Sequence, residues 1–384
     1  MKYRTLSPLT QPVSALGFGA MRLPTIPEDS KKVDEAQSIE MIRYAVDHGV
    51  NYVDTAYPYH GGVSETIIGK ALQEGYRERV YIADKLPIWK VEDRKDVRRF
   101  LDIQLERLQT GFIDLYLIHA LTEERWEKTK QLGVMEELEK AKREGLIGHI
   151  GFSFHDAYPV FVKILEEYDL WEFCQIQYNY MDVDYQAGRK GMKRAREKGL
   201  GVVIMEPLKG GQLAATPPPS VAQVWETEAG KASKAVPDPV RSALRWLWDQ
   251  EDVGTVLSGM STLEQLKENI ESAEFGFPGN MSEDERRTVV KVREAYNDLS
   301  LVGCTGCGYC LPCPEGVNIP RILEIYNDVH KYGDLHQPKR VYWDVLEPSE
   351  RADNCTECGT CEEACPQNIS IIEELAKAHE VLSR

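Results

Sequence analysis

Short apolar runs alternate with longer amphipathic stretches through most of the chain. The runs have the length of buried strands, and the stretches between them repeat their apolar residues with the helical period of about 3.6 positions. We predict strands at 16–20, 51–54, 80–84, 113–118, 147–151, 173–177, 201–205 and 253–257. We predict helices at 38–48, 93–108, 134–143 and 238–248, among others. Strands alternating with helices over about 250 residues favour an α/β fold of the (β/α)8, or TIM barrel, type. An open doubly wound sheet is disfavoured, because no GxGxxG motif follows the first strand.

The segments around the eight strands predict how the rest of the chain is organised. Residues 1–13 are expected to form a short hairpin that closes the bottom of the barrel, and helices are expected at 262–272 and 282–299. Residues 209–239 contain three consecutive prolines and few large apolar residues, which predicts an irregular loop over the barrel mouth. After residue 299 the pattern changes to Cys, Gly and Pro, with helical periodicity only near 319–331 and 371–382. We therefore place a large domain at 1–300 and a small, mostly helical one at 301–384.

Charge and composition narrow the partners and the compartment. The chain has 46 Lys and Arg against 62 Asp and Glu, a formal net charge of −16, and its basic residues form no cluster. This disfavours nucleic acid or an anionic membrane as a partner. The N-terminal residues are polar, and no run of 18 apolar residues occurs, so we expect a cytoplasmic protein. In that reducing compartment, clustered cysteines indicate metal binding rather than disulfides.

The cysteines are the strongest local signal. Of nine cysteines, eight lie in two runs near the C-terminus, each followed by proline. The first run comprises Cys304, Cys307, Cys310 and Cys313, and the second comprises Cys355, Cys358, Cys361 and Cys365. The second run has the C-x2-C-x2-C-x3-C-P spacing of bacterial ferredoxins, in which the fourth cysteine binds the other [4Fe–4S] cluster. Two clusters follow, one on Cys304, Cys307, Cys310 and Cys365, the other on Cys355, Cys358, Cys361 and Cys313. The first run has x2 where the pattern has x3, and two Zn(Cys)4 sites remain the alternative.

A second group of polar residues lies at three successive strand ends. Asp54, Lys85 and His119 end the second, third and fourth predicted strands, and Tyr59 follows in the loop after Asp54. Catalytic residues of such barrels project from the C-terminal ends of the strands. Tyrosine has an ordinary pKa of about 10, and a nearby ammonium held by a carboxylate is expected to lower it. The group is therefore predicted to protonate a carbonyl oxygen while hydride reaches its carbon. Each residue could instead have a structural role. Asp54 could cap the next turn, Lys85 could form an ion pair at the rim, Tyr59 could pack the loop, and His119 could be a buried structural histidine. The ninth cysteine, Cys174, is expected in the core.

These segments resemble the aldo/keto reductase family. The resemblance rests on the segment from Asp54 to Tyr59 with the following His-Gly-Gly, on Ala-Asp-Lys85-Leu-Pro, and on Leu-Tyr-Leu-Ile-His119, and it extends over residues 13–269. It implies that Tyr59 is the general acid, that Lys85 and Asp54 tune it, and that His119 orients the carbonyl. The tail, beginning Cys-Thr-Gly-Cys-Gly-Tyr-Cys, is similar to the subgroup that carries a ferredoxin-like iron–sulfur domain.

The resemblance also implies a nicotinamide cofactor, NADP(H) or NAD(H). The positions that match its binding residues are Ala20, Met21, Asp54, Ser153, Gln175, Met205, Pro207, Leu208, Ser258, Gly259, Met260, Gln265 and Asn269. Ser153 and Gln175 match the pair that holds the carboxamide. Met205 stands where an aromatic residue usually stacks on the nicotinamide, and Gly259 and Gln265 stand where basic residues usually bind the 2′-phosphate. Family habit therefore favours NADPH, whereas the residues favour NADH or weak binding.

Three functions are compatible with the sequence. The first is an NAD(P)H-dependent oxidoreductase that interconverts a small-molecule carbonyl and an alcohol, with the clusters in electron transfer. Hydride transfer moves two electrons together while each cluster passes one, and no clear flavin motif is present. The second function is therefore a reductase that an external electron-transfer protein supplies without nicotinamide. The third is an electron carrier or redox sensor on an inactive barrel, against which the complete set of Asp54, Tyr59, Lys85 and His119 argues.

Overall fold

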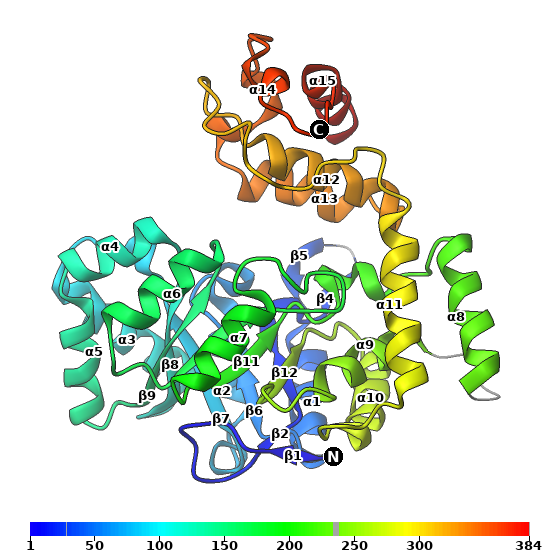
Figure 1. Ribbon diagram of the computed structural model, residues 1–384. Coiled ribbons are helices and arrows are strands. Elements are labelled where there is room, and N and C mark those ends of the chain that lie inside the picture. The colour runs from blue at the N-terminus through cyan, green and yellow to red at the C-terminus, as the bar shows by residue number, and fades with distance from the viewer. Residues whose placement is uncertain (28, 233–237, 384) are drawn as a thin grey trace. The chain divides into compact units, whose positions relative to one another are not determined.

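The computed structural model describes residues 1–27, 29–232 and 238–383, and its largest element is a closed barrel of parallel strands (Figure 1). The strands follow one another around the barrel in chain order: β3 (Leu16–Gly19), β6 (Tyr52–Asp54), β7 (Tyr81–Leu86), β8 (Ile113–Leu121), β9 (Ile147–Phe154), β10 (Phe173–Gln177), β11 (Gly201–Met205) and β12 (Thr255–Ser258). The predicted TIM barrel and its strands are confirmed.

Helices surround these strands. They are α1 (Glu35–Asp47), α2 (Val63–Ala71), α3 (Arg94–Leu108), α4 (Glu123–Gln131), α5 (Val134–Arg143), α6 (Tyr158–Glu167), α7 (Gly188–Glu197), α9 (Pro239–Trp248) and α10 (Leu263–Ser272). Helix α3 shows how the sequence fixes such a helix: Asp93 and Asp96 form a capping box at its start, and an apolar face that includes Phe100 and Leu101 is buried. No helix in the described residues is both long and apolar enough to cross a membrane.

The N-terminal hairpin closes the bottom of the barrel, as predicted. Strands β1 (Tyr3–Arg4) and β2 (Val13–Ser14) pair antiparallel. Leu6 and Val13 are buried in one apolar cluster with inward-facing barrel residues such as Leu115 and Phe173. A Cβ at Gly201, where β11 begins, would lie 1.9 Å from the Ser7 carbonyl oxygen. Glycine is therefore required there, because the hairpin backbone touches the strand directly.

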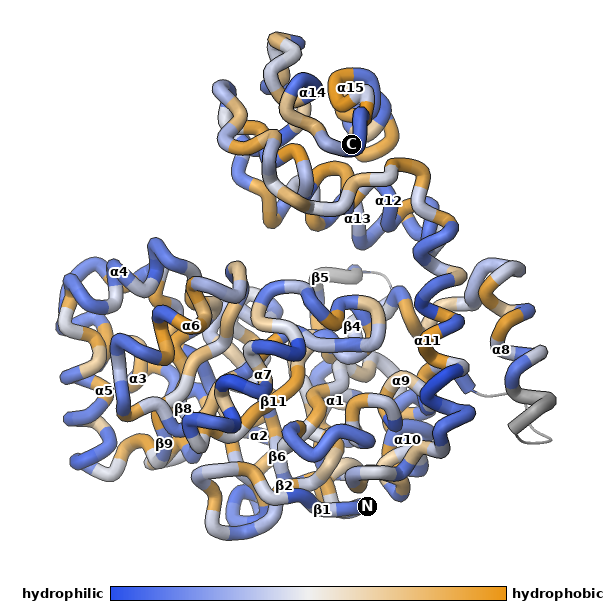
Figure 2. Tube along the Cα trace, in the orientation of Figure 1, coloured by the Kyte–Doolittle hydropathy of each residue, from blue (hydrophilic) through white to orange (hydrophobic). Residues whose placement is uncertain are grey.

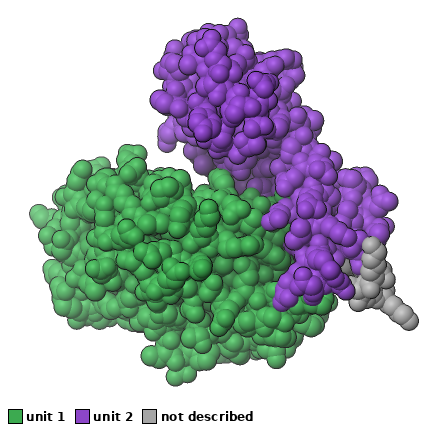
Figure 3. All heavy atoms as spheres, viewed as in Figure 1, with its two compact units in different colours: residues 1–208, 240–282 green, residues 209–239, 283–384 purple. Residues whose placement is uncertain are grey.

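The chain forms two compact units, which Figure 3 colours separately. The first comprises residues 1–208 and 240–282, and the second comprises 209–239 and 283–384. Helix α11 (Glu283–Asn297) thus belongs to the unit that carries the clustered cysteines. The boundary between the compact units therefore differs from the predicted domain boundary at residue 300. That boundary stays a prediction for the functional domains.

The prediction of an irregular loop at 209–239 is wrong for much of its length. The 3-10 turn η5 (Lys209–Ala214) leads to a helix, α8 (Pro219–Ala232), that packs on α11. Val221 and Trp225, one helical turn apart, are buried, and Glu228 pairs with Lys291 of α11 at 2.9 Å. Two large apolar residues are enough to stabilise this helix because α11 supplies the other half of the interface. The local periodicity of residues 209–239 does not reveal that partner. Residues 233–237 of this segment lie outside the described residues.

The second unit has an apolar core of its own. Helices α12 (Ile319–Tyr332) and α15 (Ile371–Leu382), both predicted, contribute Ile322, Leu323, Leu375 and Ala378 to it. Both helices carry apolar stretches, drawn orange in Figure 2. Short elements complete the unit: α13 (His336–Arg340), a π-helical turn (Val341–Val345) and α14 (Thr360–Glu363). Six of the eight clustered cysteines pack against this core, so the cysteine loops are anchored by ordinary hydrophobic packing.

Candidate active site

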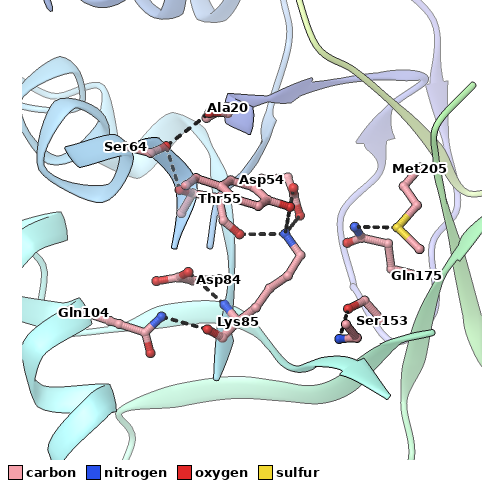
Figure 4. A network of polar contacts seen from close by, with 12 residues as sticks. Ala20, Asp54, Thr55, Ser64, Asp84, Lys85, Gln104, Ser153, Gln175 and Met205 are labelled. Atoms are coloured by element: carbon pink, nitrogen blue, oxygen red, sulfur yellow. Dashed lines mark hydrogen bonds and ion pairs between the residues drawn. The ribbon is translucent and has the colours of Figure 1, made fainter. Parts of the chain in front are cut away.

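Lys85 joins two neighbouring strands at the C-terminal end of the barrel. Strands β6 and β7 pair with Asp54 opposite Ala83, which brings the Lys85 side chain to Asp54. Its Nζ donates to both Asp54 carboxylate oxygens, at 2.8 and 2.7 Å, and to the Thr55 carbonyl at 2.6 Å (Figure 4). Burial alone would lower the pKa of Lys85, but the Asp54 carboxylate and Tyr59 more than offset this, so the pKa is raised. Lys85 is therefore a fully buried, charged ammonium.

Tyr59 lies next to that ammonium. It begins the turn η2 (Tyr59–Gly62), and its hydroxyl is 3.4 Å from Lys85 Nζ. The turn is tied to the loop after β3 because His60 Nε2 accepts from the Leu23 backbone N–H at 3.1 Å. Burial raises the pKa of Tyr59 to about 12, against the opposing effect of Lys85. Lys85 acts on this pKa in the expected direction, but desolvation outweighs the ammonium, so the net pKa is raised instead of lowered. Tyr59 keeps its proton at neutral pH.

A break in strand β8 directs His119 toward Tyr59. The strand continues to Leu121, beyond the predicted end, but its pairing with β9 shifts between Ile118 and Leu121, and Ala120 has a φ of +53°. Such bulges redirect side chains. The His119 ring lies edge-on to Tyr59, with centroids 6.0 Å apart. Burial and the nearby cations hold the pKa of His119 well below its usual value. The ring is neutral, and its buried Nδ1 has no hydrogen-bond partner among the described residues.

Behind Lys85, on the outer side of β7, two carboxyl groups are buried together. Asp84 and Glu65 of α2 are both fully buried. Asp84 Oδ1 accepts from the Lys85 backbone N–H at 2.8 Å (Figure 4). Glu65 accepts from Arg107 at 2.7 Å and from Gln104 at 3.1 Å. Burial and the neighbouring Glu65 raise the pKa of Asp84 well above its ordinary value. The raised pKa favours the protonated form of Asp84. Sequence reasoning missed this pair, which only strand-to-helix packing brings together.

Replacement of Asp84 by asparagine should change how stability depends on pH. A carboxyl whose pKa is raised by folding binds more protons in the folded than in the unfolded chain. Stability therefore falls as pH rises from about 4 toward the folded-state pKa, by about 1.4 kcal/mol per pH unit for a full proton. Asparagine can keep the hydrogen bond from the Lys85 backbone N–H and has no proton to lose. When the pH is raised from 5 to 8, the melting temperature of the Asp84→Asn variant should therefore fall less than that of the unmodified chain.

The exposed carboxyl of Asp47 provides the control for this measurement. Its hydrogen bond with Arg79 lowers the pKa of Asp47, so both folded and unfolded chains are ionised there throughout pH 5 to 8. Asp47→Asn should therefore leave the dependence of melting temperature on pH unchanged. If the melting temperatures of Asp84→Asn and of the unmodified chain changed equally with pH, a protonated Asp84 would be contradicted.

Next to this group, three predicted cofactor residues lie on adjacent strands. Ser153 of β9 is opposite Gln175 of β10. Ser153 Oγ accepts from the Ala120 backbone N–H at 2.7 Å, which leaves the hydroxyl hydrogen for another partner. Gln175 Nε2 lies 3.5 Å from the sulfur of Met205, while its buried Oε1 has no hydrogen-bond partner among the described residues (Figure 4). A carboxamide would satisfy both groups, because it offers an acceptor oxygen and a donor nitrogen.

The remaining predicted cofactor residues lie at the C-terminal ends of three strands. These are Ala20 and Met21 after β3, Pro207 and Leu208 after β11, and Ser258, Gly259, Met260, Gln265 and Asn269 at or beyond the end of β12. Asn269 donates to Ser258 Oγ at 3.0 Å, which ties α10 to the strand end. Gln265 Oε1 accepts from the Ser261 backbone N–H at 2.8 Å. All of these positions are therefore at the catalytic end of the barrel, and Gln265 is engaged within its own loop.

The eight clustered cysteines divide between two pockets in the second unit. The first pocket is lined by Cys304, Cys307, Cys310 and Cys365. The second is lined by Cys313, Cys355, Cys358 and Cys361, and Cys310 also borders it. Each pocket thus combines three cysteines of one run with the fourth of the other, which is the crossed arrangement that the spacing predicts. Cys174, in contrast, is fully buried in β10, as expected.

The turns around these cysteines suit sulfur ligands. Gly306, Gly308 and Gly359 have φ values of +68°, +77° and +80°, which let the backbone fold tightly between successive cysteines. A hydrogen bond with Thr360 lowers the pKa of the Cys358 thiol. Residues from both cysteine runs border each pocket, an arrangement typical of paired [4Fe–4S] clusters.

Comparison with known proteins agrees with this geometry. Residues 15–284 match the model of the aldo/keto reductase family, and residues 303–370 match that of a 4Fe-4S dicluster domain. The chain is 26% identical to Protein tas of Escherichia coli over 351 residues, covering 77% of this chain and 99% of that protein. It is 28% identical to Probable aldo-keto reductase 1 of Glycine max over 288 residues, with coverage of 67% and 80%.

Solved structures show the same likeness. The holo form of aldo-keto reductase AKR11C1 from Bacillus halodurans is 26% identical and covers 76% of this chain and 96% of its own, with a TM-score of 0.62. The family match spans the whole barrel together with the Asp54, Tyr59, Lys85 and His119 group. The chain therefore belongs to the aldo/keto reductase family of oxidoreductases, and it carries a 4Fe-4S dicluster domain at its C-terminal end.

Proposed function

We propose that the barrel reduces an aldehyde or ketone to an alcohol, with NADPH or NADH as the hydride donor, and that Tyr59 supplies the proton. The observation that carries the proposal is the convergence of Tyr59, Lys85 and Asp54. Lys85 Nζ lies 2.7 Å from the Asp54 carboxylate and 3.4 Å from the Tyr59 hydroxyl. Neutral His119 lies beside them. A protonated phenol, a fixed cation and a neutral imidazole at one point are what carbonyl reduction needs.

The reaction adds a hydride to the carbonyl carbon and a proton to its oxygen. The bound nucleotide supplies the hydride. Tyr59 holds the proton at neutral pH, and it donates to the oxygen as negative charge develops there. Lys85 stabilises the phenolate that remains, while Asp54 keeps the lysine charged and fixed. His119, through a ring nitrogen, holds the carbonyl oxygen next to the Tyr59 hydroxyl.

Ser153 and Gln175 are proposed to orient the nicotinamide. The Ser153 hydroxyl can donate to the carboxamide oxygen, and the unpartnered Gln175 Oε1 can accept from its amine. Such a pair fixes which face of the ring meets the substrate. Ser258 and Asn269 are proposed to shape the pocket for the rest of the nucleotide, since their hydrogen bond fixes α10 against the end of β12.

The eight cysteines are proposed to hold two [4Fe–4S] clusters, one in each cysteine pocket. Clusters of this kind pass single electrons. The clusters are therefore proposed to serve electron exchange with an external electron-transfer protein, a role separate from the hydride step at Tyr59. The crossed sharing of Cys313 and Cys365 supports this count, because each pocket offers four thiolates.

An assay on the anaerobically purified full chain tests the proposal. NADPH and NADH should each be offered with a panel of aldehydes and ketones, following nucleotide absorbance and alcohol formation together. We expect one alcohol for each nucleotide oxidised, with no added electron carrier. If neither nucleotide supports turnover but reduced methyl viologen does, the nicotinamide-dependent function is wrong, and supply of electrons through the clusters replaces it.

A further inference from the structure

The two cysteine runs repeat the same spacing but differ at one position. In each run, a glycine with positive φ follows the second cysteine: Gly308 at +77° and Gly359 at +80°. The residue after that glycine directly precedes the third cysteine, and it is Tyr309 in the first run and Thr360 in the second. The runs therefore place different side chains at matching positions of the turn.

Thr360 contacts a cysteine, whereas Tyr309 faces solvent. Thr360 Oγ1 lies 3.6 Å from Cys358 Sγ, and both residues line the second pocket. Tyr309 is 71% exposed. Among the described residues, the Thr360 contact is the only side-chain hydrogen bond to any of the eight clustered cysteines. The two pockets thus differ in whether a hydroxyl reaches a sulfur.

Local structure holds the Thr360 hydroxyl near this sulfur. Gly359 turns the backbone in the left-handed region, and Thr360 then begins α14. The Thr360 carbonyl accepts from the Ala364 backbone N–H at 3.3 Å, which closes one helical turn. A β-branched side chain has few χ1 rotamers, so little freedom remains for the hydroxyl to leave Cys358.

The hydroxyl must be the donor when Cys358 binds iron. A cysteine ligand is a thiolate and has no proton to give. An added electron increases the negative charge that the cluster shares with its sulfurs, so a donor stabilises the reduced form more than the oxidised form. Hydrogen bonds to the sulfurs are among the factors that set the reduction potential of a cluster.

We propose that Thr360 raises the reduction potential of the cluster in the second pocket by donating a hydrogen bond to the Cys358 thiolate. In the exchange step, one electron leaves the reduced external electron-transfer protein and enters this cluster, and no proton is transferred. Thr360 thereby favours placement of the electron in the second pocket. The inference rests on the two clusters proposed above, and it names a residue that tunes one of them.

Potentiometric titration of the anaerobic full chain, followed by EPR, tests the assignment without turnover. Thr360→Val keeps the shape of the side chain and removes the hydroxyl. One midpoint potential should fall and the other should stay unchanged, because only the second pocket loses a donor. A hydrogen bond of ordinary strength predicts a change of about 3- to 10-fold in the reduction equilibrium, which is a fall of about 28 to 59 mV. Thr360→Ala should cause the same fall, and Thr360→Ser should restore the original value.

Tyr309→Phe is the matched control, because it removes a hydroxyl from the same position of the first run. It should change neither midpoint potential. Unchanged potentials in Thr360→Val and Thr360→Ala, equal shifts of both potentials, or no recovery in Thr360→Ser would overturn the role of Thr360. Iron and sulfide analysis of the same samples separates this result from failure of the cluster proposal. An unmodified chain that binds no iron would overturn both.

Discussion

Replacing Tyr59 with phenylalanine should lower kcat for carbonyl reduction by about 10³-fold, within the 10² to 10⁴ range of general acid catalysis. Phenylalanine keeps the ring that lies edge-on to His119 but removes the hydroxyl that is proposed to deliver the proton. The phenol is the proposed donor because Lys85 lies 3.4 Å from its oxygen and would stabilise the phenolate that forms. Single-turnover measurement of hydride transfer, with nucleotide affinity measured separately, would isolate the effect on the chemical step.

Tyr57 supplies a matched control two residues away. Its ring packs edge-on against Phe100 of α3, with centroids 5.1 Å apart, and under the guanidinium of Arg107. Tyr57→Phe therefore makes the same chemical change outside the proton path, and turnover should remain within a few-fold of the unmodified chain. Equal nucleotide affinity in both variants would show that Tyr59 acts after binding. Hydride transfer in Tyr59→Phe at a near-normal rate would remove Tyr59 from its proposed role.

Replacing Cys365 with alanine should remove about half of the bound iron and sulfide, because one of the two proposed clusters would lose its fourth thiolate. The lost cluster should be that of the first pocket, although Cys365 belongs to the second run in the sequence. Iron and sulfide analysis with EPR of the reduced, anaerobic protein measures this. Cys174→Ala, which deletes the core thiol of β10, should leave the iron content unchanged.

Pairs of substitutions separate crossed from uncrossed ligation. Adding Cys307→Ala to Cys365→Ala should cause no further loss, since both cysteines line the first pocket. Adding Cys358→Ala instead should remove the remaining iron, since Cys358 lines the second pocket. The reverse pattern of losses would mean that each run holds its own cluster.

Local patterns determined much of this protein from the sequence alone. Strand and helix periodicity gave the barrel, because each element is buried on a face that its own residues define. Cysteine spacing predicted the two pockets, since ligands with two residues between them are delivered by a single turn. The strand ends gave Asp54, Lys85 and His119, because parallel strands in a barrel all end on one side.

Only the tertiary structure decided the properties that depend on distant segments. The pKa of Tyr59 is raised rather than lowered, because desolvation by the folded chain outweighs the Lys85 charge. Asp84 gains a buried carboxyl partner from another element. Helix α8 forms against α11, where sequence periodicity predicted a loop. In each case long-range packing sets the dielectric environment and the neighbours of a side chain, and these leave no local pattern in the sequence.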